Sequence, residues 1–96
     1  MERVACRTPT PGRVGVSNIP VWKYDLLETH IRAALAGGEM TSKALQADVR
    51  GRLNPEELAD LGSFGWHLCT VRLEMEVRGD IQRVPDKGPL KLRLSE

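Results

Sequence analysis

The segment GWHLCTVRLEMEVR, residues 65–78, most narrows the folds open to this chain, because its helical spacing is apolar on two sides. Successive residues of an α-helix advance by about 100° around the axis. One side therefore carries Leu68, Val71 and Met75. The opposite side carries Trp66, Cys69, Leu73 and Val77. The two stripes compete for one core, and the elements around this helix decide which of them is buried.

Two helices are predicted before it from apolar spacing. Residues 21–36 form the first, which the glycines at 37 and 38 end. Its stripe is Tyr24, Leu27, Ile31, Ala34 and Leu35. The second follows a short link, begins with Thr41 or Ser42 as its cap, and has a buried edge of Leu45, Val49 and Leu53.

A short third helix is predicted from about Pro55 to Leu61 by its start signal. Asn54 is a favourable cap, a proline follows where its missing N–H does no harm, and Glu57 can reach back to the cap. The long helix then starts at Gly65 or Trp66.

The end of the chain predicts a β-hairpin. Gly79 ends the long helix, the strand DIQRV follows, and residues 85–88 supply a turn that starts with proline and ends with glycine. The second strand, PLKLRL, alternates leucines with Lys91 and Arg93. Residues 1–20 contain three prolines and two glycines, which favour an extended arm. The expected organisation is an arm over 1–20 and one domain over 21–96.

The order of these elements predicts an α+β winged helix-turn-helix, with three to four helices before a two-stranded wing. The phrase MEVRGDIQRV looks like the helix-to-wing junction of bacterial winged-helix regulators, although any helix followed by a hairpin is the alternative. The segments TPTPGRVGV, KYDLLETHIRAAL and GWHLCTVRLEMEVRGDIQRVPDKGPLKLRL together resemble a family of small uncharacterised bacterial winged-helix proteins. The resemblance implies a fold. It brings no established activity, so no functional residue is carried over from it.

The junction pattern assigns Leu68, Val71 and Met75 to the core, together with Ile81 of the strand. The other stripe then occupies the side that a DNA-reading helix presents to the major groove, where base edges require polar partners. We therefore predict a protein interface made of Trp66, Cys69, Leu73 and Val77. Three alternatives stay open for its cover: the arm folding back with Val14, Val16 and Ile19, a second copy of the chain, or Trp66 simply completing the core.

Nucleic acid is the other candidate partner. Net charge is only +1, and the long helix is itself neutral, so phosphate contacts are expected from the wing and the arm. The candidate residues are Arg83, Lys87, Lys91 and Arg93 in the wing, Arg7 and Arg13 in the arm, and His67 and Thr70 on the long helix. The alternative for the wing is an ordinary solvated strand face.

Catalytic and metal-binding patterns are not recognisable in the sequence. His30 and His67 lack a second histidine at metal-ligand spacing, and Cys6 and Cys69 form no CxxC pair. Lys43 lacks the flanking residues of a phosphate loop. We expect no enzyme activity, no metal, no cofactor and no small-molecule substrate.

The expected location is the cytoplasm, because the sequence has neither a membrane-span-length apolar stretch nor a signal-peptide pattern. The expected function is that of a non-catalytic, DNA-associated, transcription-regulator-like module that binds through wing and arm. The alternative is a protein-interaction or homodimerisation module that uses the apolar face of the long helix and binds no DNA.

Overall fold

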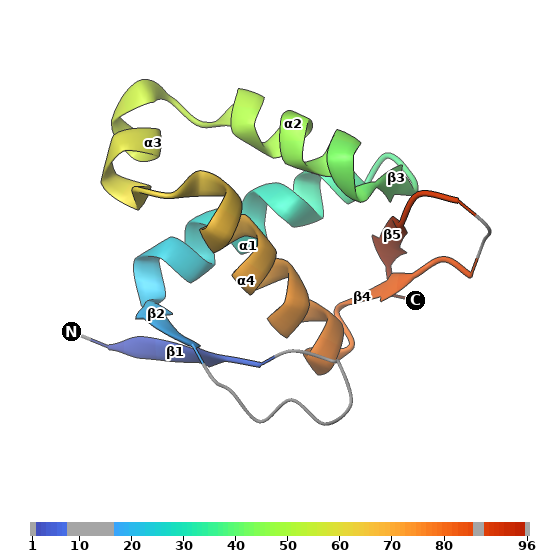
Figure 1. Ribbon diagram of the computed structural model, residues 1–96, viewed down its shortest axis with the longest axis horizontal. Helices are drawn as coiled ribbons and strands as arrows, with labels where there is room; N and C mark the ends of the chain where they lie inside the picture. The colour runs from blue at the N-terminus through green and yellow to red at the C-terminus, as the bar shows by residue number, and fades with distance from the viewer. Residues whose placement is uncertain (1, 8–16, 86–87, 96) are drawn as a thin grey trace.

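Four helices and two small antiparallel sheets make up the part of the chain that the computed structural model describes, residues 2–7, 17–85 and 88–95 (Figure 1). The elements in chain order are β1 (Arg3–Cys6), β2 (Ser17–Pro20), α1 (Val21–Leu35), β3 (Met40–Thr41), α2 (Ser42–Arg52), α3 (Pro55–Leu61), α4 (Phe64–Arg78), β4 (Ile81–Arg83) and β5 (Lys91–Leu94). None of these helices combines the length and the apolar character that crossing a membrane requires.

The core lies where α1, α2 and α4 meet. All five residues of the predicted α1 stripe are buried, which confirms the spacing. The inner side of α4 and the buried edge of α2 pack into the same cluster, to which Phe64, Leu61 and Leu92 are added. Burying a large apolar side chain contributes about 1.5–3 kcal/mol, so this cluster is the main stabilising feature of the domain.

Local capping signals set the starts of α2 and α3 as predicted. The Thr41 hydroxyl accepts a hydrogen bond from the backbone N–H of Ala44 at 3.0 Å. At the start of α3, the Asn54 side chain accepts from the N–H of Glu57 at 2.7 Å, and the Glu57 carboxylate accepts from the N–H of Asn54 at 3.0 Å. Each pair satisfies backbone donors that a helix start leaves unbonded.

The C-terminal end of α4 was predicted correctly, whereas its start was not. Gly79 ends the helix as predicted, with a φ of 81° that side chains other than glycine rarely adopt. The start was predicted slightly late, because Phe64 already belongs to the first turn and is buried.

The predicted two-stranded wing is part of a three-stranded sheet, in the order β3-β5-β4. Strand β3 lies in the link between α1 and α2, where Met40 pairs with Leu92 and Thr41 with Lys91. Sequence analysis missed this strand because two residues give no alternating pattern. Its pairing fixes the wing against the start of α2, and Leu92 is buried at the centre.

The segment predicted as an extended arm contains a hairpin of its own. Strands β1 and β2 pair antiparallel, with Val4 opposite Ile19 and Cys6 opposite Ser17. Cys6 and Ile19 are both buried in the core cluster. This hairpin lies beside the start of α1 and the C-terminal half of α4 (Figure 1).

The capping box of α3 supplies a stability prediction. Replacing Asn54 with alanine removes the acceptor for the N–H of Glu57 and should lower the free energy of unfolding by about 1 kcal/mol. Ser63 is the matched control, because it caps α4 without a side-chain hydrogen bond, and Ser63→Ala should cost less than about 0.5 kcal/mol. Urea unfolding followed by circular dichroism measures both, and equal losses would contradict the assignment.

Candidate interface on helix α4

Helix α4 presents two apolar sides, of which only one is fully covered by the described residues. Leu68, Val71 and Met75 are buried together with Ile81, as the junction pattern predicted. The outer face of α4, made of Trp66, Cys69, Leu73 and Val77, is open to different degrees. Trp66 is 50% exposed and Cys69 is exposed, whereas Leu73 and Val77 are partly buried.

The structure excludes one of the covers considered for this face. Trp66 does not complete the core, so that alternative was wrong. Ile19 lies in the core cluster and leaves the indole half exposed, so the described part of the arm does not cover it. Val14 and Val16 lie outside the described residues.

The polar side chains beside Trp66 are bound to the helix itself. The Thr70 hydroxyl donates to the Trp66 carbonyl at 2.8 Å. His67 Nδ1 lies 2.7 Å from the Ser63 carbonyl oxygen, which implies that this nitrogen carries the proton and donates it. Both residues predicted to contact bases thus donate a side-chain hydrogen bond to a nearby backbone carbonyl. His67 also packs its ring edge-on against the Trp66 ring.

Glu74 occupies the border between α4 and the arm, and its side chain is only 1% exposed. Arg7 donates to it from its backbone N–H at 2.9 Å and from its guanidinium at 3.1 and 2.8 Å. Arg78, one turn further along α4, donates at 2.7 Å. We call Arg7, Glu74 and Arg78 the Glu74 cluster. It joins the arm to the helix through charged hydrogen bonds.

The cluster shifts the pKa of the groups around it. Burial by itself would raise the pKa of Glu74, but the hydrogen bonds from Arg7 and Arg78 outweigh it and lower that pKa from 4.5 to about 2. Burial raises the pKa of the Cys6 thiol to about 11, with a further contribution from the negative charge of Glu74. Burial also raises the pKa of Tyr24, to about 12, beneath the Arg78 guanidinium. Cys6 is therefore a neutral thiol at physiological pH.

Glu76 forms a second cluster on another side of the helix. Its carboxylate is 6% exposed and accepts from Arg72 at 2.8 Å and from Arg83 of β4. Arg72 lies one turn before Glu76 on α4, and this pair is largely buried. We call Arg72, Glu76 and Arg83 the Glu76 cluster. It joins the wing to α4.

The candidate phosphate-binding residues are thus placed in several ways. Arg7 and Arg83 each form an ion pair with a buried carboxylate of α4. Arg93 is exposed on β5, and its guanidinium lies 2.7 and 2.8 Å from the side-chain oxygen of Gln82 once that amide is oriented to accept. Lys91 is partly buried on the same strand. Arg13 and Lys87 lie outside the described residues, and phosphate binding by this set stays a prediction.

A protein-family model matches most of the chain. The model of the family of unknown function DUF6958 matches residues 3–92. The chain belongs to this family. The match runs from β1 to Leu92 in β5, so the DUF6958 unit includes the arm hairpin, the four helices and the β4–β5 hairpin as far as Leu92. No curated protein and no solved structure matches the chain.

Sequence reasoning missed the contact between Arg7 and Glu74 in the DUF6958 domain. Glu74 and Arg78 stand four residues apart, a spacing that signals a helix pair. Nothing local indicates that Arg7, distant in the chain, completes the cluster. Among the described residues no group of three or more histidine, cysteine, aspartate or glutamate side chains is arranged to hold a metal ion.

Replacing Glu74 with glutamine should destabilise the domain at neutral pH. The folded-state pKa of Glu74 is depressed, so its contribution is fully present above about pH 4.5 and is lost as the pH falls towards about 2. The expected loss at pH 7 is up to about 3 kcal/mol. The variant should also lose stability less steeply than the wild type between these pH values.

Asp48→Asn is the matched control, because Asp48 pairs with Arg52 across one turn at an exposed site of α2. Such pairs contribute about 0.3–0.5 kcal/mol. Urea unfolding at a series of pH values compares the three proteins. A wild-type pH profile that Glu74→Gln leaves unchanged would show that the carboxylate does not stabilise the fold.

Proposed function

We propose that the DUF6958 domain is a winged helix whose α4 binds protein, and that two copies of the chain pair through the outer face of α4. The order of elements supports the winged helix. Strand β3 lies between α1 and α2 and joins the wing strands in the order β3-β5-β4, and α4 passes through Gly79 directly into the wing. Helix α4 then has the position of a recognition helix.

The half-exposed indole of Trp66 is the observation that carries the proposal. Tryptophan is enriched among the residues that contribute most to protein interfaces, and an exposed apolar patch usually has a partner. The nearest polar groups are already bonded within the helix, so they offer little to the base edges of DNA.

Charge supports a second copy as the partner. In a two-fold dimer each residue of the face meets the same surface again, so an unbalanced charge would repel itself. Arg72 and Glu76 neutralise each other beside the outer face of α4. Self-pairing therefore brings an ion pair, and not an isolated charge, against the second copy at this edge of the face, and it removes two indoles from water.

The proposal makes the domain a binding module without catalytic activity, working in the bacterial cytoplasm. The two free cysteines fit the reducing conditions of that compartment. The resemblance to bacterial winged-helix proteins supports the bacterial source.

Trp66→Ala should weaken self-association at least tenfold, because a central tryptophan in an interface contributes about 2 kcal/mol or more. Trp22→Ala is the matched control: this tryptophan is similarly exposed, on α1, and its removal should leave the dimer intact. Sedimentation equilibrium over a range of concentrations measures both. A wild-type chain that is monomeric at millimolar concentration excludes the dimer.

Leu73→Asp tests the facing of α4 separately. Leu73 is partly buried on the outer face, so a carboxylate there should dissociate the dimer and leave a folded monomer. Circular dichroism and thermal unfolding establish whether the monomer is folded. Loss of the folded state would mean that Leu73 is part of the core.

Weak DNA association through the wing and the arm is the second candidate function. The exposed Arg93 on β5 and the winged-helix order of elements favour it. Binding of this kind should be steeply salt dependent and nearly independent of sequence. A fluorescence anisotropy titration of duplex DNA at low salt tests it, with Arg93→Ala expected to weaken binding. No binding at about 100 μM protein, the weak end of non-specific affinity, would exclude it.

A further inference from the structure

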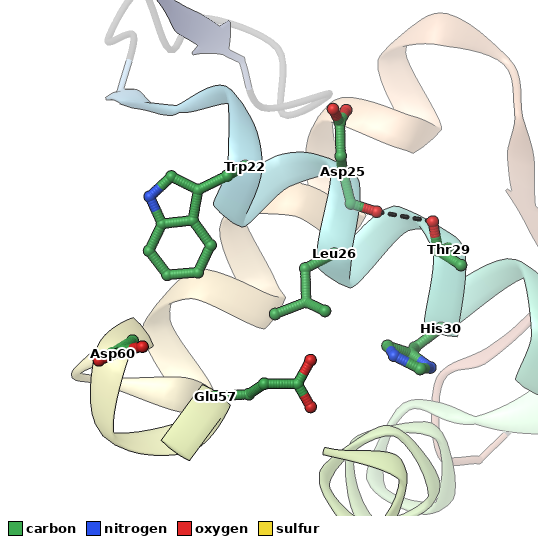
Figure 2. Close-up of a pocket in the computed structure, with 7 residues that line it drawn as sticks. All are labelled: Trp22, Asp25, Leu26, Thr29, His30, Glu57 and Asp60. Carbon is green, nitrogen blue, oxygen red and sulfur yellow. Dashed lines mark hydrogen bonds between the residues drawn. The ribbon is translucent and has the colours of Figure 1, made fainter. Parts of the chain in front are cut away.

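A hollow between α1 and α3 lies apart from the outer face of α4. Its volume is about 470 Å³, which is within the range of small ligand sites. Figure 2 shows its residues, which come from the first three turns of α1 and from α3. They are Trp22, Asp25, Leu26, Thr29, His30, Glu57 and Asp60.

The apolar part of the hollow is an exposed aromatic ring beside a leucine. Trp22 is 41% exposed, and Leu26 is partly buried next to the core cluster. The indole and the leucine side chain both face the open space towards α3 (Figure 2). This combination offers a stacking surface for a flat or aliphatic group.

The charged part of the hollow is entirely acidic. Its acidic residues are Asp25, Glu57 and Asp60, and no lysine or arginine lines the space. The Asp25 carboxylate points away from Leu26 and Glu57, so it lies at the rim (Figure 2). One oxygen of Glu57 accepts the capping hydrogen bond from Asn54, while its carboxylate points into the space between Leu26 and His30 (Figure 2). Within residues 17–85, the side chains of Asp25 and Asp60 have no ion-pair partner. The occupant must therefore supply positive charge.

One cation of the chain already approaches this indole. Lys23 Nζ lies 5.6 Å from the centre of the Trp22 ring and donates a hydrogen bond to the Leu61 carbonyl at 3.0 Å. Lys23 is not among the residues that line the hollow. The contact shows that the ring is accessible to a cation, and it leaves the three carboxylates unneutralised.

We propose that this hollow, the α1–α3 groove, binds an arginine-containing basic segment of a partner protein. A guanidinium is planar, so it can stack on the indole while its N–H groups donate to the carboxylates at the rim. Its aliphatic stem would lie along Leu26. Each part of an arginine side chain thus meets a group of matching chemistry.

Charge also excludes other occupants. Nucleic acid would bring phosphates against three carboxylates, and like charges in contact destabilise a complex. A purely apolar segment would remove those carboxylates from water without a partner. A second copy of the groove carries the same negative charge, so the groove cannot pair with itself.

Binding of a basic hexapeptide, acetyl-Arg-Gly-Arg-Gly-Arg-Gly-amide, tests the proposal on the full chain. A Trp66→Phe background leaves Trp22 as the sole tryptophan, so its fluorescence reports the groove. The peptide should quench or shift this emission. Its Kd should rise at least fivefold between about 20 and 200 mM salt, because exposed charges become screened over roughly this range. A hexapeptide with glutamate in place of arginine should not bind.

Two variants locate the site, and circular dichroism verifies that each is folded. Asp25→Asn with Asp60→Asn removes two of the three charges and should weaken binding at least fivefold. Trp22→Ala, measured by isothermal titration calorimetry, should weaken it similarly, whereas Trp66→Ala should not. Equal binding of the acidic and basic peptides, or binding that neither groove variant reduces, overturns the proposal. Self-association is measured in a separate experiment, so either proposal can fail without the other.

Discussion

The burial of Glu74 is the constraint on which the arrangement of the arm depends. A carboxylate that is 1% exposed is costly unless charged donors surround it. Three of its hydrogen bonds come from Arg7 in the arm, and a fourth comes from Arg78 on the same helix. If the arm left its place, the carboxylate would keep only the bond from Arg78. Glu76 has the same relation to the wing, through Arg83. A separation of two residues turns side chains by about 200° around a helix, so the two glutamates join α4 to opposite hairpins.

These clusters also govern what the basic residues of the domain can do. The arm and the wing were predicted to supply the positive charge that contacts a phosphate backbone. In the structure, however, Arg7 and Arg83 are ion-paired with buried carboxylates. Moving either of them to a phosphate would leave a glutamate with one donor fewer in a buried place. The ion pairs that hold the hairpins in position therefore compete with nucleic acid. The open part of α4 is the side with Trp66, where no such competition exists.

Local signals made most of the fold predictable from the sequence. The α1 stripe, the capping box at Asn54 and the end of α4 at Gly79 all depend on residues within a few positions of each other. Features made by distant segments were not predictable. Strand β3 is too short to show a period, and the Glu74 cluster requires Arg7 to meet α4. The α1–α3 groove likewise forms only when the chain folds. Trp22 and Asp60 lie far apart in the sequence, and no local pattern connects them.

The two tryptophans of the chain are both exposed, and their surroundings separate what each can bind. Trp66 lies beside a self-neutralised pair, Arg72 and Glu76, so the same face on another copy can approach it without repulsion. Trp22 lines a hollow whose other lining residues include three acidic ones, so a second copy would be repelled there and a cation attracted. Apolar area alone would not distinguish the two rings. The sign of the nearby charge does, and on this basis we propose self-pairing through α4 and a basic partner in the groove between α1 and α3.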